Sequence, residues 1–266
     1  MPTRRLSAVL IVFLAVSALA SPLLALAQQR SGVPESLVRL PVFATAVGAA
    51  VVWSIWRPYV LRPPVIRTGI ARTCLVAFAM AGAVAVVLLI VTRAEGSRWP
   101  LLSPSTLPAP LLVVLVVQLL GAAGEEIGWR GVVQPALERR LPVVRAGLVT
   151  GVLFGIGHFY VLASGVWTYL VFLMSAVGMS VALAALTAGH GLLVRISAAT
   201  LMHWLVNVVI LTLFADGDES LLWTVNTAVA MLSLGAVAAK RMTGNTAADR
   251  QGQTTADPTD RHPVTR

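Results

Sequence analysis

Eight long apolar segments constrain this chain more than any other feature of its sequence. A helix needs about 20 mostly apolar residues to cross a bilayer, and the segments have this length. Charged residues make up 12% of the chain, about half their share in soluble domains, and the residues do not alternate as in a transmembrane β-barrel. We therefore predict an all-α polytopic membrane helix bundle with helices near residues 6–27, 38–56, 73–92, 109–132, 144–163, 166–188, 195–214 and 220–239.

The positions of the basic residues predict how these helices are oriented. With a cytoplasmic N-terminus, 16 of the 20 Lys and Arg residues fall on the cytoplasmic side, and the other four are Arg30, Arg39, Arg93 and Arg98. This bias follows the positive-inside rule, so we predict a multi-pass protein of the cell membrane with both termini cytoplasmic. The topology explains the net charge of +9, and we expect the lipid bilayer, not nucleic acid, as a partner.

The two ends of the chain have sequence features of their own. Residues 1–27 also resemble a secretory signal peptide, whose removal would leave seven helices; we favour a retained first helix. Residues 243–266 are polar and show no periodicity, so we expect a disordered cytoplasmic tail. The basic residues are nearly all Arg, with Lys240 the single lysine, and with the Ala and Val content this suggests a bacterial chain from a GC-rich genome.

Few polar groups inside the apolar segments could do chemistry. They belong to the fourth, fifth and seventh segments and are Glu125, Glu126, Arg130, His158, His203 and Asn207. A charged side chain at the centre of a membrane costs at least about 2.5–3.5 kcal/mol. Each of these charges is therefore expected to have a charged partner or a function. Residues four apart lie on one face of a helix. Glu126 can therefore pair with Arg130, whereas Glu125 points elsewhere and can meet another helix.

Two mechanisms of amide hydrolysis use these residues. In the first, Glu125 and His158 activate a water molecule, while His203 and Asn207 donate hydrogen bonds to the developing oxyanion. In the second, His158, His203 and Glu125 bind a zinc ion that carries the water. The chain has no HExxH motif, the usual zinc signature on a helix. We prefer the mechanism without a cofactor and keep the zinc site as the alternative.

Each of these residues also has a simpler interpretation. A histidine in a membrane helix can bond a backbone carbonyl, Asn207 can join two helices, and Glu126 with Arg130 can be a structural ion pair. The glycines of the fourth and fifth segments either bring the catalytic helices together or serve ordinary packing. A transporter also contains buried acids and histidines, but the sequence shows no internal repeat of the kind that many transporters have.

Three motifs resemble those of a known family. GEEIGWRG at 124–131 resembles the EExxxR motif of the CPBP family, which comprises CAAX proteases and bacteriocin-processing enzymes and is also called the Abi family. FGIGH at 154–158 resembles its FxxxH motif, and HWLVN at 203–207 its HxxxN motif. The resemblance covers residues 105–215. It implies an eight-helix intramembrane endopeptidase, either glutamate-dependent or a metalloprotease. In this family Glu125 would be the base with Glu126 alongside, His158 its partner, and His203 and Asn207 the oxyanion donors.

The resemblance also divides the chain and suggests its substrates. We predict N-terminal transmembrane helices in residues 1–104, a CPBP-like catalytic transmembrane core in 105–242 and the tail in 243–266. The expected substrate is a peptide or a membrane protein. Eukaryotic relatives cut prenylated CAAX tails, which are not expected targets of a bacterial chain, and bacterial members are linked to bacteriocin maturation, self-immunity and membrane-protein processing. A noncatalytic immunity or scaffold protein on the same fold remains the alternative.

One expectation conflicts with the idea that Glu125 and His158 belong to the same site. Glu125 is expected late in a helix that runs inward, and His158 late in a helix that runs outward. At about 1.5 Å per residue, the predicted helix bounds place the two side chains about 10 Å apart in depth.

Overall fold

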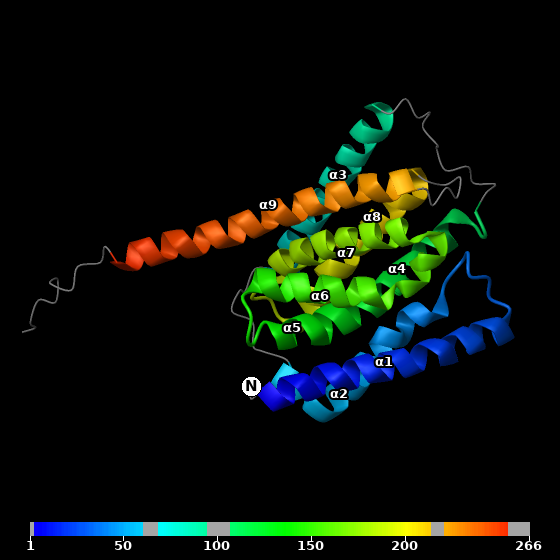
Figure 1. Ribbon diagram of the computed structural model, residues 1–266, viewed down its shortest axis with the longest axis horizontal. Helices are drawn as coiled ribbons and strands as arrows, with labels where there is room; N and C mark the ends of the chain where they lie inside the picture. The colour runs from blue at the N-terminus through cyan, green and yellow to red at the C-terminus, as the bar shows by residue number, and fades with distance from the viewer. Residues whose placement is uncertain (1–2, 61–68, 95–106, 214–220, 255–266) are drawn as a thin grey trace, which may run out of the picture.

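The computed structural model describes residues 3–60, 69–94, 107–213 and 221–254, and this part of the chain is helical without any β-strand (Figure 1). The N-terminal elements are α1 (Thr3–Ser31), the 3₁₀ helix η1 (Leu40–Phe43), α2 (Ala44–Val60) and α3 (Ile70–Ala94). The central ones are α4 (Leu111–Gly128), the π-helix η3 (Trp129–Val133), α5 (Gln134–Leu137), α6 (Val143–Gly157) and the 3₁₀ helix η4 (Phe159–Ser164). The last are α7 (Val166–Thr187), α8 (Leu192–Leu213) and α9 (Leu221–Thr254).

The predicted all-α class is confirmed in the part of the chain that the structure describes. Five described helices are long and apolar enough to cross a membrane: Arg4–Ser31, Ile70–Val91, Leu111–Leu137, Val166–Thr187 and Leu192–Leu213. Two further apolar helices, Leu40–Trp56 and Val143–Gly157, are shorter. With α9, each of the eight predicted apolar segments overlaps a described helix, while the number of eight spans and the orientation of the termini stay predictions.

Most helices lie side by side, and α3 rises at a steeper angle (Figure 1). Helix α7 packs against α6 and α9, while α4 packs against α2 and α8. Helix α1 begins and α9 ends at the left of Figure 1, which we call the N-terminal end of the bundle. At the opposite end α1 finishes, and α4 and α9 begin.

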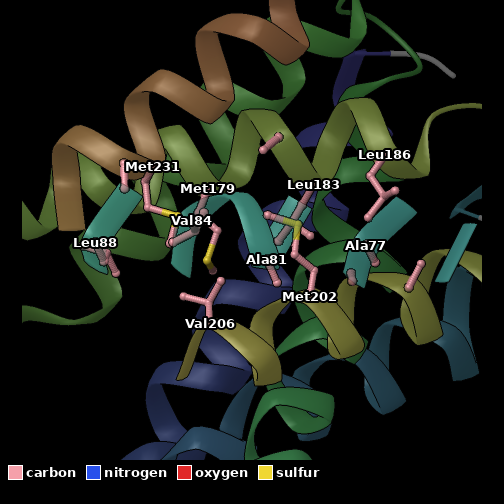
Figure 2. Close-up of a cluster of buried hydrophobic side chains, with 14 of the residues drawn as sticks. Ala77, Ala81, Val84, Leu88, Met179, Leu183, Leu186, Met202, Val206 and Met231 are labelled. Carbon is pink, nitrogen blue, oxygen red and sulfur yellow. The ribbon is translucent and has the colours of Figure 1, made fainter. Parts of the chain in front are cut away.

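Two clusters of buried apolar side chains hold the helices together. The first lies between α3, α7, α8 and α9 and includes Leu88, Leu183 and Met202, which are fully buried (Figure 2). The second joins α1 and α2 to the segment that follows α4 and includes Phe13 and Trp129. Because α4 packs on both α2 and α8, its polar residues lie where the two clusters meet.

The glycines of α4 and α6 serve the packing of each helix on a different neighbour. A Cβ added to Gly128 would lie 2.6 Å from Thr45 Cβ on α2, and one added to Gly151 would lie 2.6 Å from Val177 Cα on α7. Small residues at these positions let the helices approach closely. The glycines therefore fix α4 on α2 and α6 on α7, and they do not join the two motif-bearing helices directly to each other.

The fourth apolar segment continues beyond the predicted end at residue 132. Helix α4 passes through η3 into α5, so the helical stretch ends at Leu137. Within it lies Pro135, which has no N–H, whereas residue 135 of a regular α-helix would donate to the carbonyl of residue 131. The indole Nε1 of Trp53 on α2 donates to that Gly131 carbonyl instead, at 3.2 Å. A side chain from another helix thus satisfies the carbonyl that the proline leaves without its usual donor.

This continuation removes the expected mismatch in depth, and that prediction was wrong. Glu125 lies 12 residues before Leu137, and His158 lies 15 residues after Val143. At 1.5 Å per residue the two residues are about 18 and 22 Å from the same end of the bundle. The fifth segment also differs from the predicted helix over 144–163, because α6 stops at Gly157 and His158 is its C-cap. The 3₁₀ turn that follows ends at Gly165, whose φ of +111° favours glycine.

Helix α9 differs from the expected start of the tail. It continues past residue 242 to Thr254, into the segment for which the sequence predicts disorder. No proline interrupts the chain between residues 221 and 257, and Ala, Arg and Gln are good helix formers. The predicted disorder of residues 255–266 lies outside the described residues.

Candidate active site

The carboxylate of Glu125 lies between two histidine rings. Its Oε1 is 3.4 Å from His158 Nε2, and its Oε2 is 3.6 Å from His203 Nε2. The three side chains come from α4, the end of α6 and α8, and each is at most 15% exposed. The structure therefore brings together the carboxylate and both imidazoles named by the three sequence motifs.

The second glutamate belongs to a buried ionic network. Glu126 Oε2 is 3.0 Å from Arg130 Nε, and both side chains are fully buried. The other oxygen, Oε1, is 2.8 Å from His203 Nδ1. Arg130 Nη2 also donates to Ser180 Oγ on α7 at 3.0 Å. The paired charges lower the cost of burying ions in the bundle, and they hold the ring of His203 in one orientation.

The hydrogen bonds of the two rings assign their protons. His158 Nδ1 lies 2.8 Å from the Phe154 carbonyl oxygen, which can act only as an acceptor, so Nδ1 carries the proton. The same argument applies to His203 Nδ1, which faces the Glu126 carboxylate. Each ring therefore uses Nδ1 as an anchor and turns Nε2 toward Glu125.

Aromatic side chains enclose the His158 ring. Phe154 stacks on it with ring centroids 4.3 Å apart, while the centroids of Phe172 and Tyr160 lie 5.2 and 5.5 Å away. Phe154 also meets the edge of His203 at 6.1 Å. These apolar faces limit the access of water to the rings, which strengthens electrostatic interactions inside the site.

A cavity of about 860 Å³ opens onto these groups. Its lining includes Glu125, His158, His203 and Asn207, together with residues of α7 and α9. Asn207 also lines this cavity. It lies four residues after His203 and therefore on the same face of α8. The volume lies in the usual range of ligand sites, about 300–1,000 Å³, and is large enough for a peptide segment.

Two groups near the site carry no recognisable signal in the sequence. Ser180 sits in the run GMSVALAAL, where nothing distinguishes it from a packing residue. Its role depends on the pairing of α7 with the segment after α4, which local periodicity does not encode. Arg39 lines the cavity from the α1–α2 connection, with its guanidinium carbon 3.9 Å from the centroid of the Tyr160 ring.

A zinc site is the alternative role of the same three side chains. Glu125, His158 and His203 are of the types that bind zinc. In the described part of the chain, however, no group of three or more His, Cys, Asp and Glu side chains is arranged to hold a metal ion. His158 Nε2 and His203 Nε2 lie 3.4 and 3.6 Å from the carboxylate oxygens of Glu125, and we derive no step through a metal.

Comparison with known families agrees with the geometry. Residues 107–209 match the family model described as type II CAAX prenyl endopeptidase Rce1-like. This segment is an Rce1-like domain of the CPBP family. A comparison with curated proteins gave no match. The Rce1-like domain contains the three motifs and runs from the start of α4 into α8, and this similarity to a protease family supports the function of an intramembrane endopeptidase.

Proposed function

We propose that this membrane protein hydrolyses a peptide bond with a water molecule activated by Glu125 and His158. The observation that carries the proposal is the convergence of two anchored histidines on one carboxylate at the inner end of a cavity. A neutral His158 presents an acceptor at Nε2, and an ionised carboxylate has only acceptors. A water molecule can donate one hydrogen to each of them, which points its oxygen lone pairs toward a bound substrate.

The hydrolysis then follows in two steps. The water oxygen adds to the carbonyl carbon of the scissile bond while Glu125 takes one water proton. The C–N bond of the tetrahedral intermediate breaks, and the proton held by Glu125 passes to the leaving nitrogen. The products are a free carboxyl group and a free amine.

His203 and Asn207 stabilise the oxyanion of the intermediate in this proposal. Since Nδ1 of His203 donates to Glu126, its Nε2 can donate only when the ring is an imidazolium. The charges of Glu125, Glu126, Arg130 and a cationic His203 then sum to zero, which suits a site in a membrane. The Asn207 amide supplies a second, uncharged donor from the same face of α8.

The decisive experiment is cleavage of a quenched peptide library by the detergent-purified protein and its Glu125→Gln variant. We expect the rate of cleavage to fall about 100-fold or more in the variant, because an amide in place of the carboxylate cannot act as the base. Asp249→Asn is the matched control, since it makes the same carboxylate-to-amide change near the end of α9, beyond Met231, the last cavity-lining residue of that helix. Equal melting temperatures of the three proteins would show that the variants are folded.

The outcomes separate the mechanisms. Cleavage that survives a chelator and disappears in Glu125→Gln supports direct catalysis by glutamate. Cleavage that the chelator abolishes and zinc restores would instead support a metalloprotease that uses the same residues. Unchanged cleavage by Glu125→Gln would contradict the proposal, and a library left uncut by all three proteins would favour the noncatalytic alternative.

A further inference from the structure

We propose that Glu138 and Arg195 form a positioning pair, which holds α8 at one place along the helical stretch from α4 to α5 and thereby holds His203 and Asn207 at the active site. Neither residue of the pair belongs to the three motifs or lines the cavity. The inference rests on the proposed function for the reaction that the pair serves, whereas the position of α8 can be measured without any reaction.

The pair is buried, and several hydrogen bonds fix its geometry. Arg195 Nη2 lies 2.5 Å from Glu138 Oε2, and Arg195 Nη1 donates to Glu138 Oε1 at 3.2 Å. The two side chains are only 8% and 12% exposed. Arg195 Nε also donates to the His190 carbonyl at 3.0 Å, and Glu138 Oε1 accepts from Gln134 Nε2 at 2.7 Å. Two parallel bonds between a guanidinium and a carboxylate define an orientation as well as a distance, so the pair joins the two backbones in one arrangement.

Polar side chains recur every four residues along the stretch that carries the catalytic glutamate. They are Glu126, Arg130, Gln134 and Glu138. The first two bond each other and belong to the network at the active site, where one contacts His203 of α8 and the other contacts Ser180 of α7. The last two also bond each other, as residues four apart on a helix can.

The second couple makes the same kinds of contact as the first, further along the stretch. Its carboxylate, Glu138, bonds Arg195 of α8, and Gln134 Nε2 donates to Thr187 Oγ1 of α7 at 3.3 Å. Gln134 and Thr187 are both fully buried. The stretch is therefore tied to the same two helices at two levels, of which only the first contains motif residues.

Helix α8 is fixed to this stretch on both sides of the catalytic glutamate. On one side Trp204 Nε1 donates to the Leu115 carbonyl of α4 at 3.0 Å, and on the other side Glu138 holds Arg195. Leu115 lies 11 residues before Glu126 and Glu138 lies 12 residues after it, which is about 16 and 18 Å along the stretch. Without the pair, the first turns of α8 would be free to slide or tilt.

A small movement of α8 is enough to disturb the site. His203 Nε2 lies 3.6 Å from Glu125 Oε2, and Asn207 follows one turn later on the same face. A slide by the rise of one residue, about 1.5 Å, would carry both donors away from the oxyanion. Stability by itself does not require charges here, because uncharged residues that replace a buried ion pair often leave a protein as stable or make it more stable. What the pair adds is a single geometry.

Two variants separate positioning from stability. Glu138→Gln combined with Arg195→Met removes both charges and keeps an oxygen that accepts from Gln134, so we expect a melting temperature close to that of the wild type. Arg195→Lys keeps the charge and loses the two parallel bonds. In both we expect kcat for the peptide that the library identifies to fall about 10-fold or more with an unchanged KM, because misplacement by about 1 Å can cost about 100-fold. Arg241→Lys, at an exposed position of α9, is the matched control.

The position of α8 is measured without any substrate. In a Cys74→Ala background, nitroxide labels are attached to Leu120→Cys of α4 and Leu193→Cys of α8, whose native side chains are 54% and 72% exposed. Double electron–electron resonance then gives the distance between the two labels. We expect this distance to shift or its distribution to broaden by about 1.5 Å or more in the double variant and in Arg195→Lys. In Arg241→Lys it should match the wild type.

The possible results lead to different conclusions. A lower kcat together with a changed distance, in a protein that melts like the wild type, supports the positioning role. An unchanged distance or an unchanged kcat in both variants would overturn it, and so would a raised KM with an unchanged kcat, which would assign the pair to substrate binding. If the double variant unfolds, Arg195→Lys still makes the test. If the wild type cuts no peptide, the proposed function fails, while the distance between the labels still decides whether the pair holds α8.

Discussion

At the scale of single residues, Glu126 and Arg130 form a buried ion pair in which each charge needs the other. Arg130→Met leaves the Glu126 carboxylate fully buried without its cation, and we expect a loss of about 3–5 kcal/mol in unfolding free energy. Combining it with Glu126→Gln removes both charges and should restore most of the stability. The restored protein should stay inactive, because His203 Nδ1 loses its carboxylate partner. Denaturant unfolding in micelles checks this, and equal stability of the single and double variants would contradict it.

Ser180 is a positioning residue in this network, because it holds Arg130 and does not line the cavity. Ser180→Ala removes a buried hydrogen bond to a charged group, and we expect a cost of about 1.5–3 kcal/mol. We also expect a lower kcat with an unchanged KM, since the orientation of Glu126 and His203 changes while the substrate contacts do not. Ser233→Ala, at an exposed serine of α9, is the control. A changed KM in Ser180→Ala would contradict the assignment.

At the scale of helices, the contact of α6 with α7 positions His158. A Cβ on Gly151 would lie 2.6 Å from the backbone of Val177, which cannot give way as a flexible side chain can. We expect Gly151→Ala to destabilise the protein by about 1–3 kcal/mol and to lower activity, because α6 must move. Gly82→Ala on α3, where nothing lies within 4 Å, should instead stabilise it by roughly 0.5–1 kcal/mol. Thermal unfolding of the two variants makes the comparison.

The helices also show what the sequence can and cannot predict. Apolar length located the helical segments, and the four-residue spacing placed Glu126 with Arg130 and His203 with Asn207 on shared faces. The relative depth of Glu125 and His158 was not predictable in the same way. It depends on Pro135, whose missing N–H is replaced at the Gly131 carbonyl by the indole of Trp53, a residue 78 positions before Gly131 in the chain. The same holds for Ser180, because only the packing of α7 brings it to Arg130.

At the scale of the whole molecule, the Rce1-like domain depends on the N-terminal helices. Trp129 lies between Phe13 of α1 and Phe154 of α6, with ring centroids 5.6 Å apart on each side. Thr45 of α2 donates to the carbonyl of Gly124, next to the catalytic glutamate, and Arg39 lines the cavity. The residues named by the motifs therefore sit in a site that α1 and α2 help to build.

Two truncations follow from this dependence. A chain of residues 1–242 should keep the activity of the full chain, because the described lining of α9 ends at Met231. A chain of residues 105–266 carries all the motif residues, yet it should neither fold stably nor cleave, because Trp129 loses Phe13 and Gly131 loses the donor from Trp53. Co-expression with residues 1–104 tests the physical reason, since a supplied α1 and α2 should restore cleavage. Activity of 105–266 by itself would show that the motifs form the site without the helices that pack against them.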